Sequence, residues 1–413
     1  MLCEIVSIGS ELTSGQNLDT NAQWLSQRLA ENGLATGWHT TVADDLQANL
    51  DVLAIASRRA RVVLLTGGLG PTQDDLTREA LAKAAGVELV FHEPSLQHIT
   101  ELFRRRGRAM PERNRVQAYF PAGATPIPND FGTAPGIWMQ LGNAYVAALP
   151  GVPSEMKPMF TNWVLPRLQQ LGLAQGVLIQ RKINTFGLGE SHIEEKLFDL
   201  TRRGHVPEVG ITASDAIISL RIFGRGASVA EAQAQIAPVE QQIRARLGEL
   251  VFGVDDEDLQ HAVLKLLAEK RQTLAVAESL TGGLVSERLV SVPGASVWFR
   301  GGIVAYTDEI KTALLGVPAE LLAEKSAVSP EVAEAMAIGC RSHFQTDLAI
   351  STTGVAGPGP LAPDKPAGLV YVGLAWQGGV RSTQFSWLGT RSEIRSRTAR
   401  LALNQVRLNL LRL

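Results

Sequence analysis

A serine stands at the junction between a predicted strand and a predicted helix in the C-terminal part of the chain. Residues 273–277 are apolar and favour a strand, and residues 278–283 (ESLTGG) follow directly. A side chain at such a junction lies above the first turn of the helix, where free N–H groups stabilise an oxyanion or a phosphate. The serine elbow of α/β-hydrolases is excluded, because Ala277 and Thr281 occupy its glycine positions. Ser279 is therefore a candidate nucleophile.

A serine hydroxyl needs a base before it attacks a carbonyl group. His261 falls in a predicted helix and His343 in an HFQ segment, and neither context favours catalysis. Lys311 is the other option, because a lysine whose surroundings keep its amine neutral can accept the serine proton and serve acyl transfer on an amide or ester. The alternative is an ordinary surface charge, and spacing alone does not pair Lys311 with Ser279.

A glycine-rich loop follows a predicted strand in the N-terminal part of the chain. Residues 61–65 (RVVLL) predict the strand, and residues 66–75 have the sequence TGGLGPTQDD. Glycines let the backbone approach a ligand closely, and the N-terminus of the next helix attracts a phosphate. The dinucleotide fingerprint fails because Gln73 stands where its third glycine is required, and no Gly-Lys-Ser/Thr sequence completes a P-loop.

Asp74 and Asp75 place two carboxylates beside this predicted phosphate site. They would repel a phosphate unless a divalent cation lies between them, so the pair predicts a metal-assisted site for a phosphate or diphosphate ester. Glu11, after the first predicted strand, would face the same crevice. The alternative is structural, because Thr72 is spaced to cap the next helix with Asp75 three residues later. Spacing leaves both interpretations open.

Two further loops and two arginine runs accompany these sites. Asn129 precedes a loop of small residues at 132–136 (GTAPG), and residues 150–156 (PGVPSEM) follow another predicted strand. The six arginines between 104 and 115 predict a solvated helix face, with a phosphate or partner contact as the alternative. Arg391 opens the arginine-rich last helix, where its guanidinium could bind a phosphate with two hydrogen bonds.

The elements that position these residues predict an α/β protein. Residues 1–168 alternate strands and helices, with a capping-box helix from Thr20, which favours a mostly parallel sheet covered on both faces. Residues 173–252 predict a small α+β module, in which Ser191 opens a helix and Pro238 marks a kink or boundary. Residues 258–413 predict a second α/β unit, with strands at 273–277, 303–305, 348–352 and 369–374.

Composition agrees with this organisation. A chain of 413 residues favours two to three domains, and 45% apolar with 19% charged residues excludes wholesale disorder. The net charge of −2 argues against a generally basic nucleic-acid binder. Two cysteines, Cys3 and Cys340, exclude a disulfide framework and a four-cysteine zinc site. With no signal-peptide pattern and no long apolar segment, the sequence predicts a soluble, cytoplasmic protein.

These motifs together resemble the CinA family (competence/damage-inducible protein CinA) from end to end. The N-terminal matches are residues 9–12 (GSEL), 19–21 (DTN), 67–75 (GGLGPTQDD), 132–136 (GTAPG) and 150–156 (PGVPSEM). The C-terminal matches are residues 277–283 (AESLTGG), 293–296 (PGAS), Tyr306 with Lys311, 327–329 (AVS) and 353–358 (TGVAGP). So many motifs in one order make the resemblance highly specific.

The resemblance implies three modules and two activities. Residues 1–168 would form a MoaB/MogA-like (molybdopterin-binding-type) three-layer α/β/α domain that hydrolyses ADP-ribose to AMP and ribose 5-phosphate with a metal. Residues 173–252 would form a small α+β linker domain. Residues 258–413 would form the CinA C-terminal domain, which deamidates nicotinamide mononucleotide to nicotinate mononucleotide and ammonia. The expected protein is a bifunctional pyridine-nucleotide recycling hydrolase.

The resemblance also assigns residues at both sites. Asp74 and Asp75 would hold a divalent metal of open identity, with or without a monovalent cation beside it. The ADP-ribose contacts would be Glu11, Thr66, Gly67, Gly68, Gly70, Pro71, Thr72, Asn129, Gly136, Gly151 and Glu155. Ser279 would be the nucleophile and Lys311 its base, with no cofactor required. The mononucleotide contacts would be Glu278, Thr281, Gly282, Gly283, Tyr306, Ser329, Thr353, Gly354, Ala356, Gly357 and Arg391.

Two positions depart from the family pattern. Leu280 stands where relatives often have cysteine, and residues 359–364 (GPLAPD) replace a run of further glycines, which leaves the shape of that loop open. The expected partners are small nucleotides and a second copy of the chain in a homodimer, without nucleic acid or membrane. One alternative is a regulatory or scaffold protein of DNA uptake and repair, supported by the arginine runs. The other is a molybdopterin-binding module without hydrolysis, which the N-terminal fold alone permits.

Overall fold

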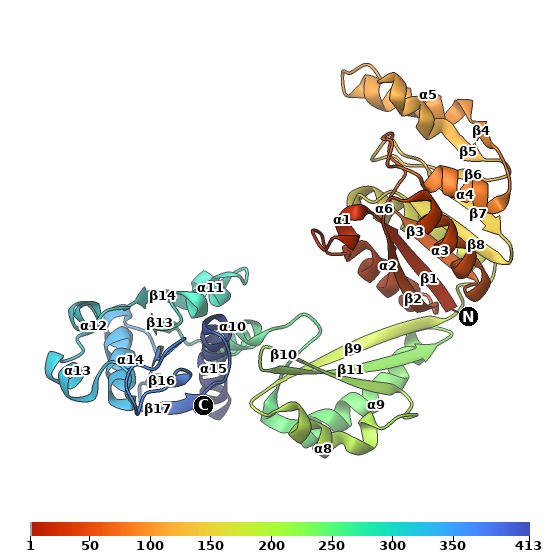
Figure 1. Ribbon diagram of the computed structural model, residues 1–413. Helices are drawn as coiled ribbons and strands as arrows, with labels where there is room; N and C mark the ends of the chain where they lie inside the picture. Colours follow the sequence, from red (N-terminus) through yellow and green to blue (C-terminus); the bar gives the residue numbers. More distant parts are fainter. Residues whose placement is uncertain (1) are drawn as a thin grey trace. The chain divides into compact units, whose positions relative to one another are not determined.

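The computed structural model describes residues 2–413, and their packing divides the chain into two compact units. One unit contains the residues up to 179 and residues 224–234. The other contains residues 180–223 and 235–413. Most of the predicted middle module therefore belongs to the same unit as the C-terminal module. Figure 1 labels the elements of each part.

A six-stranded sheet in the order β2-β1-β3-β8-β7-β6 forms the centre of the first unit. Its first four strands run parallel, and β7 and β6 are antiparallel at one edge. The mostly parallel sheet predicted from sequence is confirmed. The strands of the unit, with the separate pair β4–β5, are β1 (Leu2–Ile8), β2 (Ala35–Val42), β3 (Val62–Thr66), β4 (Leu89–Phe91), β5 (Tyr119–Pro121), β6 (Thr125–Ile127), β7 (Gly136–Leu141) and β8 (Ala144–Leu149).

Alternate residues of the buried strands supply two cores, one on each face of the sheet. Val63 and Leu65 of β3 pack with residues of α3 and α4, whereas Val62 and Leu64 pack with residues of α2, α6 and α7. Side chains of a strand point alternately to opposite faces, so the result is a three-layer α/β/α domain. The helices are α1 (Ser10–Thr13), α2 (Thr20–Glu31), α3 (Leu46–Arg59), α4 (Thr77–Ala85), α5 (Glu93–Arg105), α6 (Pro153–Met159) and α7 (Leu165–Gln170), with a 3₁₀ turn at Glu112–Ala118 and a π turn at Phe160–Val164.

Three predicted helix starts are wrong. Asp19, not Thr20, caps α2, because its carboxylate accepts a hydrogen bond from Ala22 N. Helix α4 begins at Thr77 rather than directly after Thr72, because the residues between them belong to the glycine-rich loop described below. Helix α8 begins after Gly189 without a side-chain cap, so Ser191 lies inside it.

The middle module has a four-stranded sheet in the order β10-β11-β9-β12, with two helices. The predicted alternation on β11 is confirmed, because Ile218, Leu220 and Ile222 are buried. Pro238 lies inside one continuous helix and does not mark a boundary. The elements are β9 (Val177–Phe186), α8 (Glu190–Thr201), β10 (Glu208–Ser214), β11 (Ile217–Gly226), α9 (Val229–Leu247), a 3₁₀ turn (Gly248–Leu250) and β12 (Val251–Val254).

The C-terminal module has a five-stranded mixed sheet in the order β14-β13-β15-β16-β17. β13 runs parallel to β14 and β15, and the last two strands form an antiparallel edge. The sequence analysis located all but β17. The elements are α10 (Leu259–Lys270), β13 (Leu274–Glu278), α11 (Leu284–Val290), a 3₁₀ turn (Ala295–Val297), β14 (Phe299–Val304), α12 (Asp308–Leu315), α13 (Ala319–Lys325), α14 (Pro330–Phe344), β15 (Leu348–Gly354), β16 (Leu369–Trp376), β17 (Gly379–Ser386) and α15 (Arg391–Arg412).

One hydrophobic core joins the middle module to the C-terminal module. Phe186 of β9 and Phe252 of β12 belong to the same buried cluster as residues of α10, β13 and α15. The middle module is therefore packed onto the C-terminal module rather than tethered to it. No helix within residues 2–413 is long and apolar enough to cross a bilayer.

Both cysteines are buried free thiols in different parts of the fold. Cys3 lies in β1 and Cys340 in α14, and burial raises the pKa of each thiol to about 12. A thiol with so high a pKa stays protonated at neutral pH and is a poor nucleophile. Neither lines the cavities described below.

Candidate functional site

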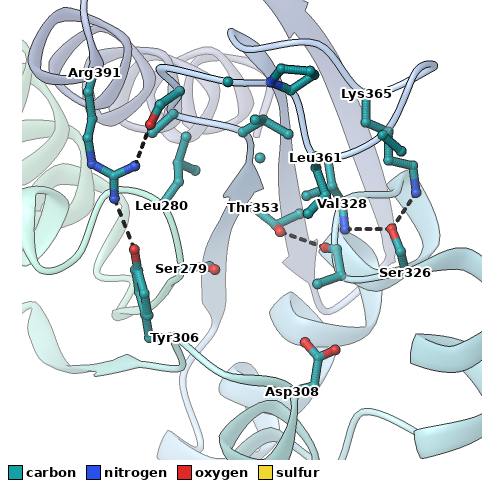
Figure 2. Close-up of a pocket in the computed structure, with 18 of the residues that line it drawn as sticks. Ser279, Leu280, Tyr306, Asp308, Ser326, Val328, Thr353, Leu361, Lys365 and Arg391 are labelled. Atoms are coloured by element: carbon teal, nitrogen blue, oxygen red, sulfur yellow. Dashed lines mark hydrogen bonds between the residues drawn. The ribbon is translucent and has the colours of Figure 1, made fainter.

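A cavity of about 860 Å³ opens in the C-terminal module, at the ends of the parallel strands β13 and β15. Its wall brings together Ser279, Lys311, Tyr306, Thr353 and Arg391, which lie far apart in the sequence. Figure 2 places the Ser279 hydroxyl between the Tyr306 side and the Thr353 side of this cavity. Ligands of α/β sheets commonly bind outside the carboxyl ends of the strands, and this cavity has that location.

Ser279 follows β13 directly and is 9% exposed. Its backbone N–H donates to Thr352 O at 2.9 Å, which ties the serine to β15, whereas its hydroxyl makes no hydrogen bond within residues 2–413. In the same stretch of described chain, the backbone N–H groups of Leu280 and Thr281 also have no protein acceptor. A free hydroxyl beside two free N–H groups suits attack on a carbonyl carbon whose oxygen becomes negative.

Lys311 reaches the same cavity from helix α12 and is 1% exposed. Its Nζ atom lies 3.3 Å from Tyr306 O and 3.3 Å from Asp308 Oδ1. No hydrogen bond joins it to Ser279 in the described chain. The wall contains no histidine among residues 2–413, so Lys311 is its buried basic group.

Arg391 stands at one side of the cavity, as Figure 2 shows. Its guanidinium donates to Gly357 O at 2.8 Å and to the Tyr306 hydroxyl at 3.0 Å. Thr390 caps this end of α15 with a reciprocal Glu393 hydrogen bond, so the arginine stands on a fixed first turn. The first turn of a helix and a planar guanidinium both favour a phosphate.

The loop that departs from the family pattern lines the other side of the cavity. Leu361, Ala362 and Asp364 belong to the wall, and so does Lys365, which the sequence analysis did not select. The Lys365 ammonium donates to Lys325 O at 2.9 Å and to the Ser326 hydroxyl. This loop is therefore attached to the segment after α13 (Figure 2).

Five residues predicted to contact the mononucleotide do not belong to the cavity wall, whereas Tyr306, Thr353, Gly354, Ala356, Gly357 and Arg391 do. Thr281 is buried and shares a hydrogen bond with the Thr352 hydroxyl at 2.7 Å. Gly282 and Gly283 have positive φ angles of 58° and 98° and form the turn into α11. Ser329 caps α14 by accepting from Val332 N. The fifth is Glu278.

The Glu278 carboxylate holds the start of α11. It accepts hydrogen bonds from the N–H groups of Gly283, Val285 and Ser286 and from the Ser286 hydroxyl, at 2.7–3.1 Å. A carboxylate at a helix N-terminus satisfies N–H groups that have no partner inside the helix. Glu278 therefore positions the turn that carries Ser279 and does not face the cavity.

We expect Glu278→Ala to lower the free energy of unfolding by about 3 kcal/mol, because it leaves buried N–H groups without an acceptor. Urea unfolding of the full chain measures this change. Glu278→Gln keeps one acceptor oxygen and should lose less, and equal stability of all three proteins would contradict the role.

Arg395 is a second residue that holds this turn, and the sequence analysis missed it. Its guanidinium donates to Leu280 O at 3.0 Å and to Thr281 O at 2.8 Å. It stands one helical turn after Arg391, so both arginines project from the same side of α15. That spacing was the signal by which the sequence could have singled it out from the arginine-rich run.

A second cavity, of about 580 Å³, lies in the N-terminal unit at the ends of β1, β3 and β8. Its wall includes most of the residues predicted there: Glu11, Gly67, Gly68, Gly70, Pro71, Asp74, Asp75, Gly151 and Glu155. It adjoins a smaller cavity of about 420 Å³, and the two share Ile8, Glu11, Gly151 and Pro153. Together they form an extended space beside the glycine loop.

Two glycines of the loop are required by close packing. Gly67 and Gly68 have φ angles of 106° and 65°. A Cβ atom at Gly67 would lie 2.1 Å from Ile8 O, and one at Gly68 would lie 2.3 Å from the Thr77 hydroxyl oxygen. That hydroxyl donates to Gly67 O at 2.9 Å. Larger residues would push the loop away from β1 and α4.

Asp75 and Arg78 fix the rest of the loop from opposite sides. The Asp75 carboxylate accepts from Gly70 N at 2.7 Å and from Thr72 N at 2.8 Å. The buried Arg78 guanidinium donates to Leu69 O and Gly70 O, and burial lowers its pKa to about 10. Asp75 therefore shapes the loop while it also lines the cavity, but Thr72 and Asp75 do not cap α4 as the structural alternative predicted. Arg78 was not predicted.

Four residues predicted to contact ADP-ribose lie outside the wall of this cavity: Thr66, Thr72, Asn129 and Gly136. Thr66 lines the adjoining cavity. Gly136 is packed inside β7, where a Cβ atom would lie 2.6 Å from Ala148 O. The Asn129 amide donates to Glu155 Oε2 at 2.7 Å and to Ala134 O at 2.9 Å. Asn129 thus holds the Glu155 carboxylate at the wall.

The N-terminal cavity is strongly acidic. Its wall contains five carboxylates, those of Glu11, Asp44, Asp74, Asp75 and Glu155. Among residues 2–413 it contains no lysine, arginine or histidine. The neighbouring Thr72 side chain is the main cause that holds the pKa of Asp74 below its usual value, so this exposed side chain stays charged. No three His, Cys, Asp or Glu side chains of the described chain stand close enough together to enclose a metal. Asp74 and Asp75 alone would therefore hold a divalent ion only together with oxygen ligands from elsewhere, such as substrate phosphates.

Many arginines of the two runs have partners inside the chain. Arg104 and Arg105 pair with Glu101, and Arg106 donates to Phe131 O. In α15, Arg397 and Arg400 pair with Asp215. The first run is exposed as predicted but is not one helix face, because α5 ends at Arg105 and a loop and a 3₁₀ turn carry the rest. Much of the second run is engaged in packing.

Comparison with known proteins matches each part of the chain. The family models described as probable molybdopterin binding domain, damage-inducible protein CinA KH domain and CinA C-terminal domain match residues 4–170, 180–253 and 256–410. Among solved structures, a CinA superfamily protein of Klebsiella pneumoniae is 28% identical, with a TM-score of 0.37, over 38% of this chain and 97% of that one. The protein CinA of Thermoplasma acidophilum is 32% identical, with a TM-score of 0.37, over 40% and 96%.

Relatives of known sequence are similar along the whole length. A CinA-like protein of Dictyoglomus thermophilum is 44% identical over 413 residues, which cover 100% of both chains. A putative competence-damage inducible protein of Caldicellulosiruptor bescii is 42% identical over 407 residues, 98% of each chain. The N-terminal domain accordingly has the MoaB/MogA-like fold. Since the family models and the full-length relatives agree, the chain belongs to the CinA family.

Proposed function

We propose that the chain is a bifunctional pyridine-nucleotide hydrolase that deamidates nicotinamide mononucleotide in its C-terminal module and cleaves ADP-ribose in its N-terminal domain. The observation that carries the proposal is the C-terminal cavity, in which Ser279 with its free hydroxyl and the buried Lys311 share one wall with Arg391. This set provides a nucleophile, a base and a phosphate ligand for one small nucleotide.

The first half of the deamidation forms an acyl-enzyme. The neutral amine of Lys311 accepts the Ser279 proton while the serine oxygen attacks the carboxamide carbon. The carbonyl oxygen becomes negative, and the free N–H groups of Leu280 and Thr281 are the available donors beside it. When the tetrahedral species collapses, the C–N bond breaks and the Lys311 ammonium protonates the leaving nitrogen, which departs as ammonia.

The second half returns the enzyme to its starting state. Water attacks the Ser279 ester and gives its proton to Lys311, the bond between carbon and the serine oxygen breaks, and the proton returns to Ser279. The product acid then releases its remaining proton to solvent and leaves as the carboxylate of nicotinate mononucleotide. Arg391 and the Tyr306 hydroxyl, which already share a hydrogen bond, would hold the phosphate at the end of the substrate away from the amide.

The N-terminal proposal rests on the shape and charge of its cavity. Two adjoining spaces that share Glu11 and Gly151 suit a ligand with two sugar halves joined by a diphosphate. Five carboxylates would repel that diphosphate in the absence of a cation, and Asp74 and Asp75 are the residues that would hold one. Held there, such an ion would supply the positive charge that offsets the diphosphate and favours its cleavage. Glu155, fixed by Asn129, is the wall carboxylate available to take a proton from attacking water.

The test uses the purified full chain with each substrate. We expect ammonia and nicotinate mononucleotide in equal amounts from nicotinamide mononucleotide, at a rate that a chelator leaves unchanged. From ADP-ribose we expect AMP and ribose 5-phosphate, and here a chelator should stop the reaction. Failure to turn over either substrate would remove that half of the proposal.

The alternative of a DNA-binding scaffold has weaker support. The arginine runs that favoured it are in large part paired with Glu101, Asp215 and backbone oxygens. Salt-sensitive DNA binding by the full chain would revive it. A molybdopterin-binding module without hydrolysis would bind the pterin and leave ADP-ribose intact in the same assay.

A further inference from the structure

The tip of the β10–β11 hairpin belongs to the middle module but packs on the C-terminal module. Ser214 pairs with Ile217, so Asp215 and Ala216 form a two-residue turn in which both φ angles are positive, at 49° and 65°. Such turns favour glycine at the second position, and alanine is strained there. Ala216 and Ile217 pack against the hydrophobic core that the middle and C-terminal modules share. The side chain at 216 thus makes a contact that glycine would not make.

Three side chains of α15 surround Asp215. The Ser396 hydroxyl donates to its carboxylate at 2.6 Å, and Arg400 donates both to the carboxylate and, at 2.8 Å, to Asp215 O. Arg397 Nε lies 3.8 Å from the same carboxylate. One acidic side chain of the middle module is therefore held by consecutive turns of the helix that carries Arg391.

A second carboxylate and a third arginine complete this cluster. Arg288 of α11 donates to the Ser396 hydroxyl at 2.9 Å and lies 3.4 Å from Asp258. Arg400 also approaches Asp258, at 3.7 Å. The pKa of Arg288 is lowered by burial and then by the charge of Arg400. Asp215 supplies one of the two negative charges that keep these partly buried arginines together.

The same turns of α15 hold the Ser279 turn through Arg395, the residue directly before Ser396. Its guanidinium binds the carbonyl oxygens of Leu280 and Thr281. In a planar trans peptide the N–H points opposite to the C=O, so the bond to Leu280 O also fixes the direction of the free Thr281 N–H. Arg288 acts at the far end of the same segment, because it lies on the helix that the turn begins.

We propose that Asp215 of the middle module is a positioning residue for the Ser279 site. It fixes the first turns of α15, and Arg395 on those turns holds the peptide groups whose N–H groups lie beside Ser279. The kinetic part of this inference rests on the proposed deamidase function, whereas its structural part does not. In this account the middle module is a component of the C-terminal active site.

The test replaces Asp215 with asparagine in the full chain. Asparagine tolerates the positive φ angle but carries no charge, so the turn is kept while the arginines lose their counter-ion. We expect faster hydrogen exchange of the backbone amides at 282–286, and kcat for ammonia release lower by on the order of tenfold with little change in KM. Asp199→Asn is the matched control, because Asp199 pairs with Arg246 within the middle module, and it should change neither quantity.

The outcomes separate the two proposals. Unchanged exchange at 282–286 in Asp215→Asn would overturn the inference, whatever the substrate proves to be. A wild-type chain that releases no ammonia would overturn the proposed function, and the exchange measurement would still decide the role of Asp215. If Asp215→Asn does not fold, Ser396→Ala removes one link and keeps every charge, and the same readouts apply to it. Arg395→Lys, which loses the two-pronged contact, should reproduce the exchange pattern.

Discussion

Ser279→Ala removes ammonia release from nicotinamide mononucleotide, with a loss in kcat/KM on the order of 10⁴-fold or more. The reason is that the cavity wall offers no second group that combines a free hydroxyl with the neighbouring free N–H groups of Leu280 and Thr281 in the described chain. The measurement is ammonia release by the purified full chain, with ADP-ribose hydrolysis followed in parallel as the internal reference.

Two further variants sharpen this result. Lys311→Met should cause a comparable loss, and the double variant should be hardly worse than either single one, because nucleophile and base act as a unit. Ser291→Ala is the matched control, because Ser291 is exposed and its hydroxyl donates only to Arg288 O. Full activity in Ser279→Ala, with unchanged folding, would exclude the serine mechanism.

Asp74→Asn lowers metal-dependent cleavage of ADP-ribose by about 100-fold while the fold is kept. Asp74 is the suitable position because its side chain is exposed at the cavity, whereas Asp75 also holds Gly70 and Thr72. The loss should be reduced at high metal concentration, since asparagine retains one ligand oxygen. Initial rates at increasing metal concentration measure both effects.

The pH dependence gives an independent check on Asp74. Its pKa is lowered, so its carboxylate remains charged below the pH at which an ordinary aspartate takes up a proton. In initial rates measured at decreasing pH, protonation of Asp74 should therefore begin to limit the activity only below the ordinary aspartate pKa of about 3.9. Asp51→Asn removes a carboxylate on an exposed face of α3 and is the control variant for both the pH and the metal measurements. Equal metal dependence of Asp74→Asn and wild type would contradict the assignment.

The parallel core of each α/β module was predictable because its strands are short apolar runs, each followed by a turn that contains glycines. Residues 61–65 and 273–277 predicted β3 and β13, each shifted by one residue, and the loops after them line the two cavities. Where a strand is exposed at an edge, as β17 is, its polar alternation carries no such signal, and the sequence analysis did not find it.

Helix starts were less predictable than strands. The spacing of Thr72 and Asp75 matches a helix cap, and the two residues do share hydrogen bonds, but they close a loop that ends before α4. The spacing therefore predicted the hydrogen bonds between Thr72 and Asp75 but not that they belong to a loop rather than to a helix. Arg78 and Thr77 decide the difference, because they draw the loop carbonyl groups onto the start of α4.

The cavity walls were predictable where the chain turns at a strand end, and less so where a side chain arrives from elsewhere. Ser279 and Gly67 follow their strands directly. Arg395, Lys365 and Asp215 act through contacts between segments far apart in the sequence, and no local pattern marks such contacts. Glu278 shows the converse, because a residue next to the nucleophile faces away from the cavity and caps a helix.

The central claim is that Ser279 forms an acyl-enzyme, and partitioning with hydroxylamine tests it most directly. The wild-type chain is incubated with nicotinamide mononucleotide and increasing hydroxylamine, and the products are separated. The account predicts that a hydroxamate replaces part of the nicotinate mononucleotide, because the Ser279 ester reacts with either nucleophile. Nicotinate mononucleotide as the single product at every hydroxylamine concentration, with ammonia still released, would contradict it.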